Sequence, residues 1–213
     1  MHPRRLGFVA FAAAAIGLAA CDHRDEPVPT PERPTPATSG KTGAVATQKP
    51  RSKPAATAPA RCIKPTPEQP VRVVLGAIPD PSCPADPGPV PQLEHKAINI
   101  VTPLGNKRVD VEVAAKDEDR QRGLMYRTAL DTNAGMLFEF EDERVLTFWM
   151  HNTCLPLDMI FIAKDGVIVG IEENTPTLSD QTFSPGCAAS YVLEVNAGWT
   201  RKNGVRAGMK VEL

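Results

Sequence analysis

The sequence predicts a mainly β domain, either a β-sandwich or a closed barrel with one or two short helices, preceded by a disordered proline-rich linker. Residues 22–95 contain 17 of the 22 prolines, and no aromatic residue lies between Phe11 and Tyr126. Such a segment cannot bury enough apolar surface to offset the entropy lost on ordering. Residues 96–213 are long enough for a hydrophobic core. Within them, short alternating apolar segments recur between turn residues, a pattern typical of all-β domains.

The first two strands of the domain are predicted to form a hairpin. In residues 107–114, Val109, Val111 and Val113 alternate with charged side chains, which indicates a half-buried strand. Turn residues at 104–106 precede this strand, so we expect residues 97–101 to pair with it.

A second hairpin turn and the same alternation predict the later strands. Lys164, Asp165 and Gly166 form the turn, which joins expected strands at residues 158–163 and 167–172. Further strands are expected at residues 136–140, 145–152, 191–195 and 209–213.

Two short stretches favour helix. Residues 117–127 begin with acidic side chains and place Glu118 and Arg122 at i, i+4. Residues 199–203 favour one helical turn that ends at Gly204.

The N-terminal sequence is typical of an export signal peptide. Two arginines precede the apolar run 6–20, which is too short to span a membrane comfortably. Its end, Leu18-Ala19-Ala20-Cys21, resembles the lipobox of bacterial lipoproteins. The resemblance implies lipid on Cys21 and anchoring to the cell envelope on the periplasmic side, and Asp22 weakly favours the inner membrane. The alternative is a soluble secreted protein cleaved near Ala20.

The linker, residues 21–95, separates this signal (residues 1–20) from the domain at 96–213. Its proline content favours an extended spacer, although a proline-rich ligand for a partner protein is an alternative. Between Cys62 and Cys83 lies an apolar patch at residues 71–78. This patch is expected either to form a short stapled element or to pack on the domain.

Four cysteines remain once Cys21 is assigned to lipid, which suits an oxidising compartment. Proximity along the chain favours the pairs Cys62–Cys83 and Cys154–Cys187. The alternative is that Cys154 is a catalytic thiol with His151 nearby.

Four segments resemble the DUF192 family, also called UPF0127, in order and spacing across about residues 106–213. They are RGLMYR at 122–127, GMLF at 135–138, FWMHNTCLPLD at 148–158 and YVLEVNAG at 191–198. The resemblance implies a compact β-sandwich-like domain of jelly-roll type. It implies no established activity, because the family is named for lacking one.

Candidate ligand-binding residues lie within these segments. On the strand at 145–152, Trp149 and His151 share the face opposite Leu146, Phe148 and Met150, so an indole and an imidazole occupy a face that need not be buried. A tryptophan beside polar groups suits stacking on a flat ligand. The alternative is that both faces of the sheet are covered.

Polar residues around residues 155–157 complete the candidate set. Asn152, Thr153 and Asp158 either bond nearby backbone or form a polar pocket. Arg127 and Glu194 are possible partners there, or form a structural ion pair. Asp158 and Glu194 would support acid–base catalysis only if they converged across a cleft.

Several classes of function are disfavoured. Residues 96–213 carry 13 Lys and Arg against 17 Asp and Glu, a net charge of −4, whereas nucleic acid requires a clustered basic face. No pattern of zinc or haem ligands, phosphate-binding loop or serine-hydrolase elbow is present, so no metal or cofactor is expected. Three hypotheses remain: a lipid-anchored module that binds a small molecule, glycan or envelope protein; an envelope-acting enzyme; and a structural or assembly factor.

Overall fold

The computed structural model describes residues 60–73 and 76–213. The signal segment, Cys21, Asp22 and residues 22–59 of the linker lie outside the described residues. Within the described part, no helix is long and apolar enough to cross a membrane.

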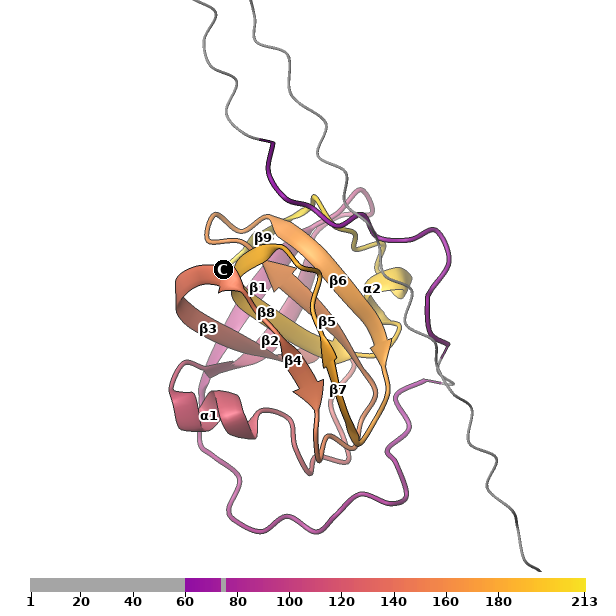
Figure 1. Cartoon of the computed structure of the whole chain (residues 1–213), viewed down its shortest axis with the longest axis vertical. Coiled ribbons are helices and arrows are strands. Elements are labelled where there is room, and N and C mark those ends of the chain that lie inside the picture. Colours follow the sequence, from indigo (N-terminus) through magenta and orange to yellow (C-terminus); the bar gives the residue numbers. More distant parts are fainter. Residues whose placement is uncertain (1–59, 74–75) are drawn as a thin grey trace, which may run out of the picture. The chain divides into compact units, whose positions relative to one another are not determined.

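The fold is built on one seven-stranded sheet with the strand order β6-β5-β8-β3-β2-β1-β9 (Figure 1). Parallel pairing joins β2 to β3, and each of the other neighbouring pairs is antiparallel. The strands are β1 (Glu94–Val101), β2 (Lys107–Ala114), β3 (Ala134–Val145), β5 (Leu157–Ile162), β6 (Ile168–Thr175), β8 (Ala188–Asn196) and β9 (Lys210–Glu212).

The sheet curls until its two edges meet. The backbone N–H of Ile168 donates to the carbonyl of Met209 at 2.8 Å, and that of Val211 donates to Gly166 at 2.8 Å. The turn at Gly166 requires glycine, because its φ is 87° and a Cβ there would lie 2.4 Å from the carbonyl oxygen of Val211. The mainly β prediction is confirmed, and the observed form is a curled, barrel-like sheet.

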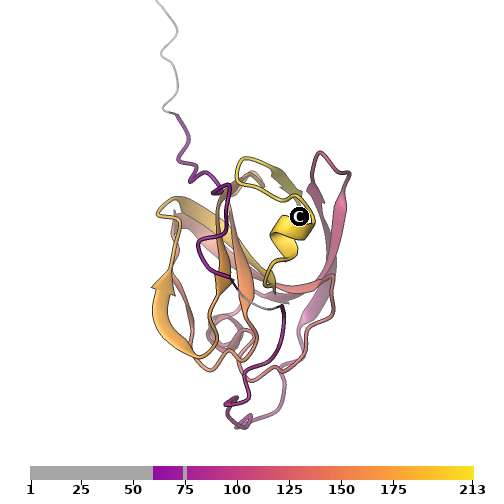
Figure 2. The same cartoon turned by 90° about the vertical axis from the view of Figure 1, so that its right-hand side faces the viewer.

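A small second sheet and two short helices complete the fold. The second sheet pairs β4 (Phe148–Met150) with β7 (Ser179–Phe183). The helices are α1 (Asp117–Arg122) and α2 (Trp199–Lys202). Figure 2 shows α2 inside the curl of the large sheet.

Both faces of the central strands are buried, so the domain has two apolar clusters. Along β3, Met136 and Phe138 belong to the cluster that includes Leu146 and Met150, beside β4, whereas Leu137 belongs to the cluster around Trp199 in α2. This arrangement follows from the two-residue period of a strand, which sends neighbouring side chains to opposite faces. It explains why each residue of β5 is buried.

The segment before β1 packs on the domain. We call its described residues, 60–73 and 76–93, the strap. The backbone N–H of Lys64 donates to Val169 at 2.8 Å, and that of Asp80 donates to Cys154 at 2.7 Å. The strap backbone therefore contacts the domain on both sides of the apolar patch. The described apolar side chains of the patch itself do not pack there, because Val71, Val73 and Ile78 are 75%, 81% and 64% exposed.

The disulfide pairing expected from chain proximity is wrong. The structure pairs Cys62 with Cys187 and Cys83 with Cys154, with Cα atoms 5.5 and 5.3 Å apart. The reason is that the strap runs along the domain instead of folding back on itself, so each of its cysteines meets a cysteine of the domain. Cys154 is buried and disulfide-bonded, so the interpretation of a catalytic thiol is also wrong.

The predicted elements differ from the observed ones mainly at their ends. The hairpin of β1 and β2 is confirmed. The helix expected over residues 117–127 ends at Arg122, because Gly123 has a φ of 48° and lies against the ring of Phe138. The strand expected at 145–152 is divided between the end of β3 and β4. Strand β7 was not predicted, because its sequence is mostly polar.

Candidate functional site

A groove opens between α1 and the aromatic residues of β3 and β4. Its volume is about 270 Å³. Phe140, Phe148 and Trp149 supply the apolar side, while α1 supplies polar side chains. We call this hollow the aromatic groove; it is lined by Asp117, Arg120, Gln121, Phe140, Thr147, Phe148 and Trp149.

A smaller cavity adjoins the groove. Its volume is about 30 Å³, and Arg120, Gln121, Phe148 and Trp149 line both hollows. We call it the inner cavity. Its additional lining residues are Arg122, Gly123, Leu124, Met125, Phe138, Thr153 and Glu194.

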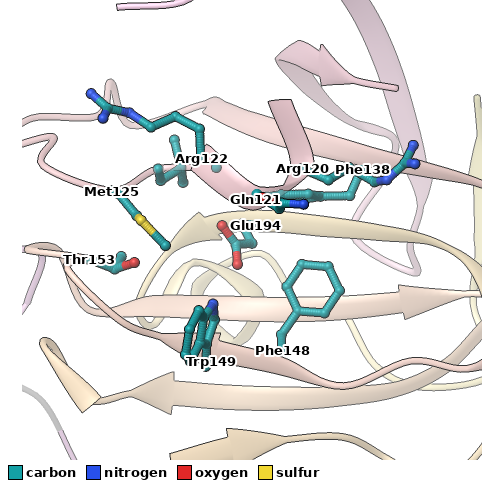
Figure 3. Close-up of a pocket in the computed structure, with 11 residues that line it drawn as sticks. Arg120, Gln121, Arg122, Met125, Phe138, Phe148, Trp149, Thr153 and Glu194 are labelled. Carbon is teal, nitrogen blue, oxygen red and sulfur yellow. The ribbon is translucent and has the colours of Figure 1, made fainter. Parts of the chain in front are cut away.

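Glu194 is the central polar group of the inner cavity. Figure 3 shows its carboxyl group in the middle of the cavity, above Trp149 and Phe148. The side chain is 4% exposed, and burial raises its pKa to about 8. None of the residues that the structure describes forms a hydrogen bond or an ion pair with this carboxyl group. Glu194 is therefore mainly neutral at pH 7 and free to pair with a bound molecule.

The two arginines that line the cavity do not neutralise Glu194. Arg120 bonds to the carbonyl of Glu139 at 2.8 Å and to the carboxylate of Asp117, and its guanidinium lies over the ring of Phe140. Arg122 pairs with Asp86 and holds the pKa of that carboxyl below its usual range. Both guanidinium groups point away from Glu194 in Figure 3.

Trp149 forms the outer wall and is held in place from its far side. It is 50% exposed, although the next residue of β4, Met150, is fully buried. Its ring stacks on His151, with centroids 4.8 Å apart and planes 21° apart. His151 Nδ1 lies 2.6 Å from Oδ1 of Asp180 on β7. The predicted exposed face of Trp149 and His151 is thus present, with His151 supporting the indole from outside the groove.

Of the two predicted loop residues Asn152 and Thr153, one lines the inner cavity and the other does not. Thr153 is buried and lines the inner cavity, while its hydroxyl donates to the carbonyl of His151 at 3.2 Å. Asn152 adopts a φ of 51°, and its amide donates to the hydroxyl of Tyr126 at 2.8 Å. Asn152 therefore joins two loops and does not line either hollow.

Arg127 lies in a different part of the domain. It makes a bidentate ion pair with Glu112, at 2.5 and 2.6 Å, and lines a separate hollow near β2. The ion pair expected between Arg127 and Glu194 is therefore absent, and Arg127 pairs with Glu112 instead.

Asp158 is buried on the opposite side of the sheet from Glu194. In the antiparallel pair of β5 and β8, Asp158 faces Val195 and Met159 faces Glu194. Residues that face each other project to the same side, so the two carboxyl groups project to opposite sides. The convergence required for acid–base catalysis by Asp158 and Glu194 is therefore absent from the structure.

The carboxylate of Asp158 is fully occupied by the fold. Oδ1 accepts from the backbone N–H of Asn174 at 2.9 Å and of Gly198 at 3.1 Å. Oδ2 accepts from the backbone N–H of Thr200 at 3.0 Å and from its hydroxyl at 2.6 Å. Asp158 thus fixes the start of α2 against β5 and β6.

Sequence reasoning did not find the α1 side of the groove. Arg120 and Gln121 immediately precede the family-like segment at 122–127, so this segment was the available signal for the α1 side of the groove. Phe148 was assigned to the core, and it does pack there, at 5.0 Å from the ring of Phe138. Its remaining surface lines both hollows.

The chemistry available to the groove is binding by stacking, apolar contact and one neutral carboxyl group. Among the described residues, no group of three or more His, Cys, Asp or Glu side chains is placed to hold a metal ion. The fold and the groove together define a curled β-sheet domain with a disulfide-bonded strap and a recessed acidic side chain.

Comparison with known proteins places this domain in a family. The DUF192 family, described as "Uncharacterized ACR", matches residues 99–213, and the chain therefore belongs to it. No curated protein matches the chain.

Two solved structures share the fold. A protein from Sinorhizobium meliloti 1021, described as a candidate transcription regulator, is 39% identical with a TM-score of 0.56; the match covers 59% of this chain and 97% of that one. A protein of unknown function from Novosphingobium aromaticivorans DSM 12444 is 28% identical with a TM-score of 0.57, over 66% of this chain and 94% of that one.

Proposed function

We propose that this protein is a lipid-anchored binding module of the bacterial cell envelope that holds a small molecule in the aromatic groove and inner cavity. The observation that carries the proposal is Glu194, buried and unpaired beneath the half-exposed ring of Trp149. Small-molecule sites typically combine aromatic walls with a few placed polar groups. A buried carboxyl group with a strongly shifted pKa in a cleft is characteristic of functional sites.

The envelope location rests on two features. Disulfide bonds persist in oxidising compartments such as the periplasm, and the chain has two of them. The segment Leu18–Cys21 resembles a lipobox. Lipid on Cys21 would supply the contact with the membrane.

The charge of the domain does not favour a DNA-binding role, which the description of the Sinorhizobium protein as a transcription regulator would suggest. Contact with DNA is supported by clustered basic residues, whereas residues 96–213 carry a net charge of −4. The groove, by its lining, suits a small molecule better than a nucleic-acid strand.

Tryptophan fluorescence provides the test. The chain has two tryptophans; Trp149 lines the groove, while Trp199 is buried in the other apolar cluster. We expect one or more compounds from a panel of sugars, small aromatic molecules and aliphatic molecules to change the emission and raise the melting temperature of the full chain.

Matched variants locate the binding. Trp149→Ala should abolish both effects, and Leu104→Ala, which truncates another exposed apolar side chain on the turn between β1 and β2, should retain them. Equal stabilisation of Trp149→Ala and the wild type by every compound that binds would refute a site in the groove.

A further inference from the structure

Resting on the binding function proposed above, we infer that the inner cavity takes a primary ammonium group, so that the ligand is an amine on a slender apolar stem. The starting point is the carboxyl group of Glu194, which is 4% exposed and aimed into the cavity (Figure 3). A buried polar group without a partner is costly. A ligand satisfies Glu194 either by accepting a hydrogen bond from the acid or by bringing a cation to the carboxylate.

The walls of the cavity favour the cation. Three aromatic residues, Phe138, Phe148 and Trp149, line it together with the thioether of Met125. Aromatic faces attract ammonium groups through their quadrupole and are unfavourable for the lone pairs of a carbonyl oxygen. The hydroxyl of Thr153 donates its proton to the carbonyl of His151, so its oxygen remains an acceptor for an N–H group.

No cation of the domain already fills this role. Arg120 and Arg122 are the cationic residues lining the cavity, and each bonds to another carboxylate, that of Asp117 or that of Asp86. His151 lies behind the ring of Trp149 and pairs with Asp180. The ligand therefore has to supply the positive charge.

The size of the cavity selects the kind of cation. Its volume, about 30 Å³, is far smaller than the 270 Å³ of the adjoining groove. The smaller end of a ligand therefore belongs in the inner cavity, and a primary ammonium group is smaller than a trimethylammonium or guanidinium group. The adjoining groove of about 270 Å³, with Phe140, Phe148 and Trp149 on its apolar side, accommodates the stem.

Binding of an ammonium ion also requires Glu194 to lose its proton, so the affinity depends on pH. Below pH 8 the neutral acid must release its proton to solvent for the carboxylate to meet the ammonium ion, because burial holds the pKa of Glu194 at about 8. Affinity should therefore rise by about tenfold for each pH unit up to that value and then level off. A ligand that accepts a hydrogen bond from the acid would show the opposite trend, losing affinity above pH 8.

The test compares probes with similar stems and different head groups. Pentylamine, 1-pentanol, pentanamide and pentyltrimethylammonium are titrated into the full chain at millimolar concentrations between pH 6 and pH 9. The reporter is the indole N–H resonance of Trp149 in ¹H–¹⁵N spectra, which detects weak binding. We expect pentylamine to bind at least tenfold more tightly than the other three at pH 8.

A blocked lysine, N-acetyl-lysine methylamide, is added to the panel to identify the source of the amine. Weaker binding than pentylamine indicates a free amine, and tighter binding indicates a lysine side chain.

The Glu194→Gln variant separates this inference from the proposed function. It keeps the shape of the side chain and removes its ionisation, so both the preference for pentylamine and the pH dependence should be lost. Equal or tighter binding of pentanol or pentanamide to the wild type would overturn the amine and leave the binding function standing. Perturbation of Trp149 by none of the probes would overturn the inference, and failure of the wider panel as well would overturn the proposed function.

Discussion

Glu194 and Asp158 lie on neighbouring strands, yet their carboxyl groups differ in hydrogen bonding. Asp158 accepts four hydrogen bonds, whereas Glu194 faces aromatic rings with its carboxyl group unpaired among the described residues. The difference arises from side-chain alternation, which turns one carboxyl group toward α2 and the other toward the inner cavity. One carboxylate therefore stabilises the fold, and the other is available to a ligand.

Replacing Glu194 should change how stability depends on pH. Its folded-state pKa, about 8, exceeds the usual value of 4.5, so the folded protein binds more protons than the unfolded chain between these values. The contribution of Glu194 to the free energy of unfolding therefore falls as pH rises through this window, by at most about 1.4 kcal/mol per pH unit. Glu194→Gln lacks this loss, so its advantage over the wild type should grow up to about pH 8.

Urea unfolding at several pH values between 5 and 9 measures the difference. The wild type is the matched reference, because other carboxyl groups titrate equally in both proteins. A difference between the two that stays constant with pH would show that Glu194 is ionised throughout.

Asp158→Asn should destabilise the domain. The amide keeps one acceptor oxygen but places an NH₂ group against donors that now bond to a carboxylate oxygen. We expect a loss of about 1–3 kcal/mol, measured as a lower midpoint in urea. The control is Asp142→Asn at an exposed site in β3, which should change the midpoint little. An unchanged midpoint in Asp158→Asn would mean that these hydrogen bonds add little to stability.

At the scale of elements, the strap is fixed to the domain by charge as well as by covalent bonds. Arg61 pairs with Asp165 in the turn between β5 and β6, and Lys64 and Arg72 both reach Glu172 on β6. Each disulfide closes a long loop, with a sequence separation of 125 between Cys62 and Cys187 and of 71 between Cys83 and Cys154. In the chain-entropy model, loops of this length restrict the unfolded state by about 4–5 kcal/mol each.

Peptide mapping of the non-reduced protein tests the strap directly. We expect cross-linked peptides that join Cys62 to Cys187 and Cys83 to Cys154. Recovery of a peptide joining Cys62 to Cys83 would show that the strap folds back on itself. As a second measurement, Cys83→Ser with Cys154→Ser should lower the stability by about 2–5 kcal/mol, with the Cys62–Cys187 bond still formed.

Sequence patterns predicted the structure correctly where alternation along a single strand decides which side chains are buried. Alternation of Val109, Val111 and Val113 identified β2, and the same rule separated Trp149 from Met150. They failed where the answer depends on pairing between distant segments. The disulfide partners depend on the path of the strap, and the separation of Asp158 from Glu194 depends on the register of β5 against β8. The aromatic groove forms because α1 lies beside β4, and no local sequence pattern predicts that these two elements are neighbours.

For the whole molecule, lipid on Cys21 would decide where the domain works. Labelling cells with a radioactive or clickable palmitate should mark the wild type and not Cys21→Ser, and the wild type should partition into membranes. Several acyl chains on one residue give stable anchoring. Membrane partitioning of Cys21→Ser after complete removal of the signal would contradict the lipobox, whereas loss of partitioning supports it.

The bond between Cys62 and Cys187 also sets the path of mechanical tension through the protein. A pull from the N-terminal side of the chain enters the domain at Cys62 and crosses directly to Cys187, at the start of β8. From there it runs along the same strand to Glu194, whose side chain lines the inner cavity. Much of the rest of the strap lies outside this route. Tension between a tethered N-terminus and a molecule gripped in the groove would therefore be carried by one covalent bridge and one central strand, with β8 loaded in shear against β3 and β5 on either side.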